Sequence, residues 1–411
     1  MAGSKTVDLS FLQSMMDKIE PGVKIDSYES KLGSKRGDNY TSMLYRIKLF
    51  GERGWTKSLI YKCLPENKQT RSKYKSEMLF NNEMTFYVKS YTALMEYQEL
   101  KRFTDTFNSV PKCYFARSDI IVLEDMRCKG FTMLDRKKGL DFDHCKAILR
   151  GLGKFHGLSL SMKVDEPEKF KRCISEAIKE VYYKSENELW YKGYYRRAAE
   201  NAKKMLESEL TEDEKPKYLE KFRKHVNPES FFGDMVELVS PKEPLAVLCH
   251  GDCWTNNFLF QYALDGSISE ISVVDFQMAR YGSPALDLVS LLYCCTGVEL
   301  RRRCLPALMD EYYDSVSRIL TQTNCSVHYP DLREKLDGEL REYTVFGLGV
   351  ALDVIPIATC DSEQAPDMYT AEEDADDGPG DEPYPAATTS ALCRAMIADL
   401  VKELVDNGRL K

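Results

Sequence analysis

Two short segments combine carboxylate and amide side chains in an order that could support phosphoryl transfer. The first, HGDCWTNN, places Asp252 and Asn257 five positions apart, and the second, VVDF, places Asp275 directly after an apolar run. Phosphoryl transfer needs a carboxylate to orient the attacking hydroxyl and oxygen ligands to hold Mg²⁺ against the phosphates. We therefore predict Asp252 as the catalytic base and Asn257 and Asp275 as metal ligands.

Each of these residues has a simpler interpretation when taken alone, because aspartate and asparagine are common turn residues. The three residues taken together favour a catalytic site over ordinary turns. Short apolar segments that read as strands precede both Asp252 and Asp275, and base, amide and metal carboxylate follow the order used by protein kinases. His250 is expected to support the loop by hydrogen bonding and not to react.

The segment from His250 to Asn257 matches the HGDxxxxN motif of aminoglycoside phosphotransferases and choline kinases. With Trp254 and Gln277, in HGDCWTNN and DFQ, it more closely resembles the ecdysteroid kinase-like family, also called CHK kinase-like. The resemblance covers roughly residues 25–350. It implies an α+β, two-lobed protein-kinase-like fold that uses ATP and Mg²⁺ as cofactors, with a small β-rich N-lobe and a larger, mainly helical C-lobe.

The same resemblance implies a lysine on a small-lobe strand that holds the α- and β-phosphates, and Lys62 in LIYKCL matches it. A glutamate on the next helix should pair with that lysine. Glu83 matches the FxxExxFY pattern of the family, and Glu77 is the competing candidate. The simpler interpretations are an outward-facing strand lysine and a solvated helix glutamate.

A phosphate-covering loop is expected between the first two strands, within residues 33–42. It is polar and contains glycine, which permits close backbone approach to phosphates, so we assign Gly37, Asn39 and Ser42 to nucleotide binding. An ordinary polar hairpin turn is nearly as good an interpretation. Lys62 contributes both to catalysis and to nucleotide binding in this scheme.

The segment VLEDM is the expected hinge between the lobes, where backbone groups of Glu124 and Met126 would hydrogen bond to adenine. Further along, Asp287 resembles the aspartate that braces the catalytic loop in the family. A plain helix N-cap is an equal interpretation of Asp287.

Hydrophobic periodicity places these residues on elements. Short β-branched or aromatic segments predict strands between residues 24 and 64, at 113–126, and directly before Asp252 and Asp275. Helical periodicity is expected in these segments: 8–20, 73–97, 143–160, 331–352 and 388–406. We predict an N-lobe over residues 1–125 and a C-lobe over residues 126–411.

Length and composition limit the class of protein. A chain of 411 residues with 43% hydrophobic and 30% charged residues suits two packed lobes. The net charge of −8 disfavours nucleic acid as a main partner. The 13 cysteines form no CxxC pair, and no signal-peptide core or spanning apolar run is present, so we expect free thiols, a cytoplasmic protein and no membrane insertion.

The acceptor is expected to be a small hydroxylated molecule, and ecdysteroid hormones are the named case for the family. The tyrosine-rich segment 182–196 could line a steroid-sized apolar pocket, or could pack on the large lobe, and Val354–Pro356 could help to close the pocket. The acidic segment 361–385 reads as a mobile loop, either an inert insertion or a lid.

Three other readings stay open. A choline, aminoglycoside or other xenobiotic kinase would have the same chemistry with a different acceptor. A catalytically inactive, ligand-binding fold would be expected to have lost one of the four residues Lys62, Asp252, Asn257 and Asp275, and all four are present. A protein kinase is disfavoured by the lack of an activation segment ending in an APE-like motif.

Overall fold

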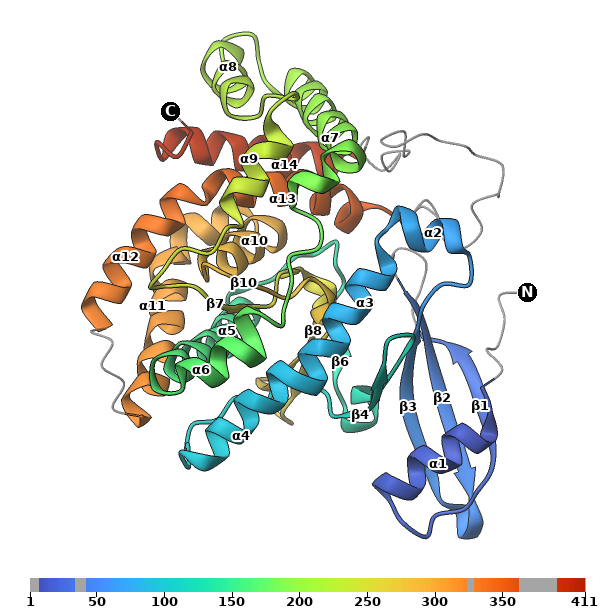
Figure 1. The fold of residues 1–411 in the computed structure, drawn as a ribbon. Helices are drawn as coiled ribbons and strands as arrows, with labels where there is room; N and C mark the ends of the chain where they lie inside the picture. The colour runs from blue at the N-terminus through green and yellow to red at the C-terminus, as the bar shows by residue number, and fades with distance from the viewer. Residues whose placement is uncertain (1–6, 34–41, 324–328, 362–389, 411) are drawn as a thin grey trace.

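The computed structural model describes residues 7–33, 42–323, 329–361 and 390–410 (Figure 1). An antiparallel sheet of five strands, in the order β1-β2-β3-β5-β4, forms the amino-terminal part. The strands are β1 (Ile25–Leu32), β2 (Met43–Gly51), β3 (Thr56–Cys63), β4 (Cys113–Arg117) and β5 (Ile120–Glu124).

Strand alternation decides which face of β2 each residue serves. Tyr45, Ile47 and Leu49 are buried and form one apolar cluster with helix α1 (Leu9–Ile19). Arg46, between them, points to the other face and lines a cleft. One face of the sheet is therefore its core and the other is available to a ligand.

A helical rod crosses from the sheet to the rest of the molecule (Figure 1). It consists of α2 (Lys68–Lys73), α3 (Ser76–Thr85), a π-helical turn (Phe86–Tyr91) and α4 (Thr92–Leu100). Phe80, Phe86 and Leu94 on this rod are buried in the large core that continues into the carboxy-terminal part. Helix was predicted for 73–97, and the structure adds the π-helical turn within it.

The carboxy-terminal part is mainly helical, and two small sheets lie within it. Its helices are α5 (Phe142–Asp165), α6 (Pro167–Phe170), α7 (Glu188–Glu209), α8 (Lys215–His225), α9 (Phe231–Leu238), α10 (Ala285–Cys295), α11 (Val298–Gln322), α12 (Tyr329–Glu342), α13 (Thr344–Thr359) and α14 (Ala391–Asp406). The small sheets are β6 (Thr132–Met133) with β8 (Phe258–Tyr262) and β9 (Ile268–Val273), and β7 (Val247–Cys249) with β10 (Arg280–Gly282). The predicted α+β class, a β-rich part followed by a larger helical part, is confirmed.

The predicted helix over residues 331–352 is wrong as one element. The chain forms α12 and α13 there, bent by 54° at Tyr343. The bend lets α13 lie close against α10: a Cβ atom on Gly347 would lie 2.6 Å from the ring of Tyr293. Strand β8 was also not predicted, and the lobe boundary after residue 125 stays a prediction.

In the described part of the chain, no single helix is both long and apolar enough to span a membrane. The bent pair of α12 and α13 passes the same length and composition test only when the two helices are taken together.

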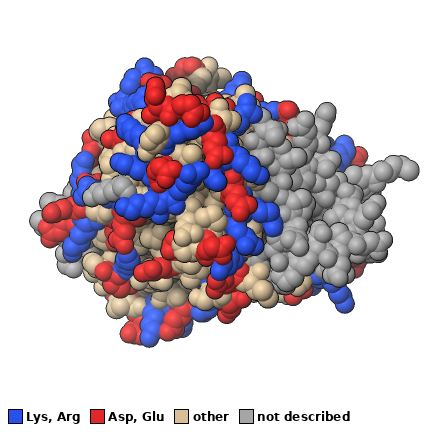
Figure 2. Space-filling model, turned by 90° about the horizontal axis from the view of Figure 1, so that it is seen from above, with Lys and Arg blue, Asp and Glu red and all other residues tan. Residues whose placement is uncertain are grey.

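Charged side chains of both signs are interspersed on the face seen in Figure 2. Among the ion pairs, Arg223 of α8 lies 3.1 Å from Glu207 of α7, and Lys217 of α8 lies 2.6 Å from Asp406 of α14. Exposed pairs of this kind contribute roughly 0–1 kcal/mol each. Burial of apolar side chains such as Phe222 beneath them contributes more, about 1.5–3 kcal/mol per large side chain.

Helices α5 and α11 approach most closely where α5 carries glycine. A Cβ atom on Gly153 would lie 2.7 Å from the Cβ atom of Ser315 and 2.7 Å from the carbonyl oxygen of Tyr312, both on α11. These atoms belong to the backbone or are attached to it, so they cannot move away unless the helix shifts. The packing of the two longest helices therefore requires glycine at position 153.

We predict that Gly153→Ala lowers the free energy of unfolding by about 1–3 kcal/mol, because the added methyl group forces α5 and α11 apart. Gly338→Ala in α12 is the matched control, since nothing lies within 4 Å of its Cβ position. That variant should be neutral or more stable by about 0.5–1 kcal/mol. Urea unfolding followed by circular dichroism measures both, and equal stability of the two variants would contradict the prediction.

Candidate active site

A cleft of about 660 Å³ lies between the amino-terminal sheet and the helical part. It brings together Lys62 from β3, Glu83 from α3, and Asn257 and Asp275 from the two segments predicted to carry chemistry. The apolar lining residues are Leu32, Leu44, Ile60, Pro111, Leu123, Met126, Phe131, Met133, Leu134, Leu259 and Val274. Arg46, Glu124, Asp125, Arg127, Asp135, Arg136 and Asn256 also line it. A mainly apolar cleft with a few converging polar groups is the usual form of a small-molecule site.

Lys62 lies at the centre of a buried ion network. Its Nζ atom is 2.5 Å from Oε2 of Glu83 and 2.8 Å from Oδ1 of Asp275, and its side chain is 4% exposed. Burial lowers the pKa of Lys62, but the charges of Asp275 and Glu83 outweigh burial and the net shift is upward. Lys62 is therefore a permanent positive charge in the cleft, not an outward-facing strand lysine.

The loop after β7 presents Asp252 and Asn257 side by side. The Nδ2 atom of Asn257 donates to Oδ2 of Asp252 at 2.8 Å and to its backbone carbonyl at 2.9 Å. These bonds use both hydrogens of the amide nitrogen, so the amide oxygen of Asn257 faces the opposite side. Burial and the nearby charge of Asp275 raise the pKa of Asp252 to about 7.

Asp287 of α10 holds the loop after β7 in place. Its two carboxylate oxygens accept from the backbone N–H groups of His250 at 2.6 Å and Gly251 at 2.8 Å. The bracing role expected for Asp287 is confirmed, and the N-cap interpretation is wrong because the aspartate is the third residue of the helix. His250 also supports the loop as expected: its ring contacts the carbonyl oxygen of Val274 at 2.9 Å and accepts from the N–H of Asp252 at 3.2 Å.

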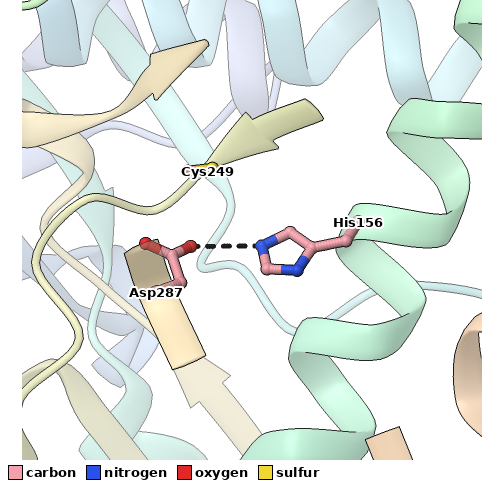
Figure 3. Close-up of side chains that lie close together, drawn as sticks. All are labelled: His156, Cys249 and Asp287. Carbon is pink, nitrogen blue, oxygen red and sulfur yellow. Dashed lines mark hydrogen bonds and ion pairs between the residues drawn. The ribbon is translucent and has the colours of Figure 1, made fainter. Parts of the chain in front are cut away.

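Figure 3 shows that His156 of α5 reaches the same aspartate, with Nε2 3.1 Å from Oδ2 of Asp287. Its Nδ1 atom is 3.0 Å from the hydroxyl of Tyr312. Cys249 lies beside them, and the ligand atoms of the three residues lie within 4.8 Å of one another. Burial raises the pKa of the Cys249 thiol well above its ordinary value, and the thiol donates to the carbonyl of Ser283 at 3.3 Å. Each of the three groups has a hydrogen-bond partner within the protein, and through Asp287 the cluster supports the loop.

Asp275 has a left-handed backbone, with φ +67° and ψ +68°, which is uncommon for a residue with a side chain. The next ring, Phe276, is buried and stacks on Phe86 of the helical rod, with 3.7 Å between ring centroids and 6° between ring planes. It also meets the ring of His250 edge-on at 4.7 Å. Burial of Phe276 holds the strained turn, so that the carboxylate of Asp275 faces Lys62.

The donor set in the cleft fits Mg²⁺, because an amide oxygen and a carboxylate are hard oxygen ligands. Lys62 bonds Oδ1 of Asp275, so Oδ2 is the oxygen left to face a cation. Glu124 and Met126, the predicted hinge residues, also line the cleft. The residues present therefore fit both the metal and a nucleotide.

A polar network behind the hinge has no local sequence signal. Asp125 is 3% exposed and accepts from Nε of Arg46 and from Oγ of Ser58, each at 2.7 Å. Arg46 lies on β2, Ser58 lies on β3 and Asp125 directly follows β5, so only the pairing of these three strands reveals the network. It anchors the segment between Glu124 and Met126.

The predicted phosphate loop is only partly described. Gly37 and Asn39 lie outside the described residues, as does nearly all of the acidic segment. Ser42 is 1% exposed and is not among the residues that line the cleft, whereas Gly33 at the other end of the loop is. On α3, Glu77 is exposed and lies 3.8 Å from an arginine, so Glu83 and not Glu77 faces Lys62.

Part of the tyrosine-rich segment belongs to the core. Tyr183 and Tyr195 are buried, and their hydroxyl oxygens lie 2.8 Å apart. This is the packing that the alternative interpretation of the segment predicted. Tyr194 is half-buried, and its hydroxyl donates to the carboxylate of Asp353 on α13.

Gly251 offers a test of how tightly the loop is held. It has φ +85°, and a Cβ atom there would lie 1.9 Å from the carbonyl oxygen of Met278. We predict that Gly251→Ala lowers the free energy of unfolding by about 3 kcal/mol, from left-handed strain plus the backbone clash. Gly266→Ala has the same strain, with φ +84°, but nothing within 4 Å, and should cost about 1 kcal/mol. Thermal and urea unfolding compare the two, and equal losses would show that the clash is relieved at no cost.

Several solved structures are similar to this chain at low sequence identity. An ethanolamine kinase of Plasmodium vivax is similar over 92% of this chain and 85% of its own, with 15% identity and a TM-score of 0.39. A macrolide 2′-phosphotransferase of Brachybacterium faecium is similar over 95% of this chain and 98% of its own, with 12% identity and a TM-score of 0.36. A streptomycin–ATP–APH(2″)-IIa ternary complex is similar over 89% and 99%, with 13% identity and a TM-score of 0.34. No curated protein matches the sequence at a significant level.

A model of the ecdysteroid kinase-like family matches residues 36–325, which is more than two thirds of the chain. The matched range contains every polar residue described above in the cleft and in the loop after β7. The resemblance inferred from HGDCWTNN and DFQ is therefore confirmed, and with it the kinase-like fold. The chain belongs to the ecdysteroid kinase-like family.

Proposed function

We propose that this protein transfers the γ-phosphate of ATP to a hydroxyl of a small lipophilic alcohol, of which an ecdysteroid is the case that the family name suggests. The observation that carries the proposal is the convergence of Lys62, Asn257 and Asp275 in one cleft, with Asp252 hydrogen-bonded to Asn257. These are the residue types that phosphoryl transfer requires.

On the nucleotide side, the proposal gives each residue one task. Lys62, held by two carboxylates, binds the α- and β-phosphates. Asn257 and Asp275 hold Mg²⁺ through their oxygens, and backbone groups of Glu124 and Met126 bind adenine. When bound, Mg²⁺ supplies neutralisation of the phosphate charge. Positioning and electrostatics, not covalent chemistry of the protein, then account for the rate.

On the acceptor side, Asp252 accepts the proton of the attacking hydroxyl. The hydrogen bond from Asn257 fixes the orientation of the Asp252 carboxylate, so the proposed base and the proposed metal ligand keep the same relative position. A base whose pKa lies near the working pH combines a useful deprotonated fraction with sufficient basicity. The raised pKa of Asp252, about 7, supports this role.

The acceptor itself is proposed to lie between α7 and α13. Asp353 on α13 accepts from the Tyr194 hydroxyl, and its charge contributes to raising the pKa of Asp252. Asp353 therefore lies within electrostatic reach of the base. The half-buried ring of Tyr194 offers an apolar surface beside a polar group, which suits an alcohol with a hydrophobic body.

Asp353 also favours a second candidate, a kinase for choline, aminoglycosides or another cationic xenobiotic. Burial raises the pKa of Asp353, and a cationic acceptor would stabilise its charged form. A catalytically inactive ligand-binding protein is the third candidate, and the complete set of Lys62, Asp252, Asn257 and Asp275 argues against it. ADP release with Mg²⁺-ATP across an ecdysteroid, choline, an aminoglycoside and a protein substrate separates these candidates.

We predict that Asp252→Asn lowers kcat by about 10²–10⁴-fold, the usual contribution of a general base, with the fold intact. Asp275→Asn should abolish the Mg²⁺-dependent rate, and asparagine tolerates the left-handed backbone found there. Asp265→Asn, in the exposed turn between β8 and β9, is the matched control and should leave ADP release unchanged. Normal turnover by folded Asp252→Asn protein would remove Asp252 from the role of base.

The pH dependence follows from the raised pKa of Asp252. Below about pH 7 the free protein holds this carboxyl protonated, so kcat/KM should fall about tenfold per pH unit on the acid side. Because the charge of Asp275 is one cause of the shift, saturating Mg²⁺ should move this acid limb to lower pH. Steady-state kinetics from pH 5.5 to about 8.5 at low and high Mg²⁺ test both effects. A flat profile, or a limb that Mg²⁺ does not move, would contradict the prediction.

A further inference from the structure

Asn82, the residue before Glu83 on α3, is buried at a junction of three segments. Its side chain is 4% exposed. Its Nδ2 atom donates to the carbonyl oxygens of Gln277 at 3.0 Å and Ala279 at 2.8 Å, and its Oδ1 atom accepts from the N–H of Lys179 at 3.0 Å. One amide side chain thus makes three hydrogen bonds, all to backbone groups of the carboxy-terminal part.

Both carbonyl oxygens belong to the loop that carries Asp275. That loop turns sharply through the left-handed backbone of Asp275, so its path depends on what holds it afterwards. Asn82 holds it at Gln277 and Ala279, and Phe276, directly before Gln277, is stacked on the same helical rod. The neighbouring residue, Glu83, bonds Lys62, which in turn bonds Asp275. Consecutive residues of α3 therefore hold the Asp275 loop at two points. Asn82 binds its backbone, and Glu83 acts on the side chain of Asp275 through Lys62.

The third hydrogen bond of Asn82, accepted from the N–H of Lys179, ties the Asp275 loop to the segment that leads to Tyr182 and Tyr183. Beyond Lys179, Glu180 accepts from the N–H groups of Tyr182 and Tyr183, each at 2.9 Å. The other carboxylate oxygen of Glu180 lies 2.9 Å from Nε of the buried Arg280, directly after Ala279. The amide side chain of Asn82 therefore joins the Asp275 loop to the segment that begins at Lys179, at the start of the proposed acceptor side.

We propose that Asn82 is a positioning residue for phosphoryl transfer, which fixes the Asp275 loop to α3 and keeps it in register with the segment that begins at Lys179. The inference rests on the proposed function, because it gives Asp275 the task of holding Mg²⁺. Asn82 is not among the residues that line the cleft. It acts by presenting Asp275 to the metal before any ligand arrives, so the ligand does not have to order the loop.

The test compares Asn82→Asp with Asn81→Asp. The first variant is nearly isosteric, but it replaces the donor to two carbonyls with a carboxylate oxygen that repels them. The second adds the same charge one residue away, at an exposed position on the same helix. Groups that orient a metal ligand typically affect metal affinity or activity by 10–100-fold. We expect Asn82→Asp to raise the Mg²⁺ concentration for half-maximal rate by about 10–100-fold and to lower kcat, and Asn81→Asp to stay within about twofold of wild type.

A merely structural role would lower the thermal midpoint and leave the Mg²⁺ dependence unchanged, and that result in a folded variant overturns the proposal. If Asn82→Asp does not fold, Asn82→Ala removes both donations without adding charge and is measured in the same way. Calorimetric titration of ATP at several Mg²⁺ concentrations gives a readout independent of turnover. Wild-type protein that binds Mg²⁺-ATP but releases no ADP with any acceptor contradicts the proposed function alone, and the Asn82 variants still decide the present inference by their Mg²⁺-dependent binding. Absence of Mg²⁺-ATP binding by the wild type overturns both.

Discussion

One buried positive charge holds the two parts of this structure in register. Lys62 on the sheet contacts carboxylates from α3 and from the loop after β9, at 2.5 and 2.8 Å. Removing one partner from a buried ion pair typically costs about 3–5 kcal/mol, because the other charge stays buried without compensation. Rotation of the sheet against the helices would separate Lys62 from Asp275, so the cleft resists opening. Lys62 thus has two carboxylate partners, Glu83 and Asp275, which hold its charge at one place in the cleft.

Asp287 and Asp252, both at the loop after β7, have pKa values that their surroundings shift in opposite directions. Burial alone would raise the pKa of Asp287, but hydrogen bonds and charge from His156 and the backbone N–H of Gly251 outweigh burial and lower it. Burial and the charge of Asp275 raise the pKa of Asp252, and the single hydrogen bond from Asn257 does not offset them. A carboxylate that must hold backbone groups therefore stays ionised, while the one proposed to take a proton is held near the pH at which it can exchange one.

Helix α3 connects these two environments. Glu83 reaches Lys62, Asn82 reaches the backbone of the loop that follows Asp275, and Phe86 stacks on the ring of Phe276. Three residues of one helical rod thus define where Asp275 lies. Asn82, Glu83 and Phe86 are all buried, so their contacts are part of the core.

The sequence by itself predicted most of the elements and the two motifs that carry Asp252, Asn257 and Asp275, but it missed β8 and the bend at Tyr343. Hydrophobic periodicity is local, and Asp252 and Asn257 lie within one loop, so their types and spacing are readable from a few residues. Only the tertiary structure decided that Glu83 and not Glu77 meets Lys62, that Asp287 braces the loop, and that Asn82 holds the segment after Asp275. Those contacts join residues as far as 197 positions apart, as for Asn82 and Ala279. Their geometry depends on how helices and strands pack, and that packing is a property of the whole core and not of any local pattern.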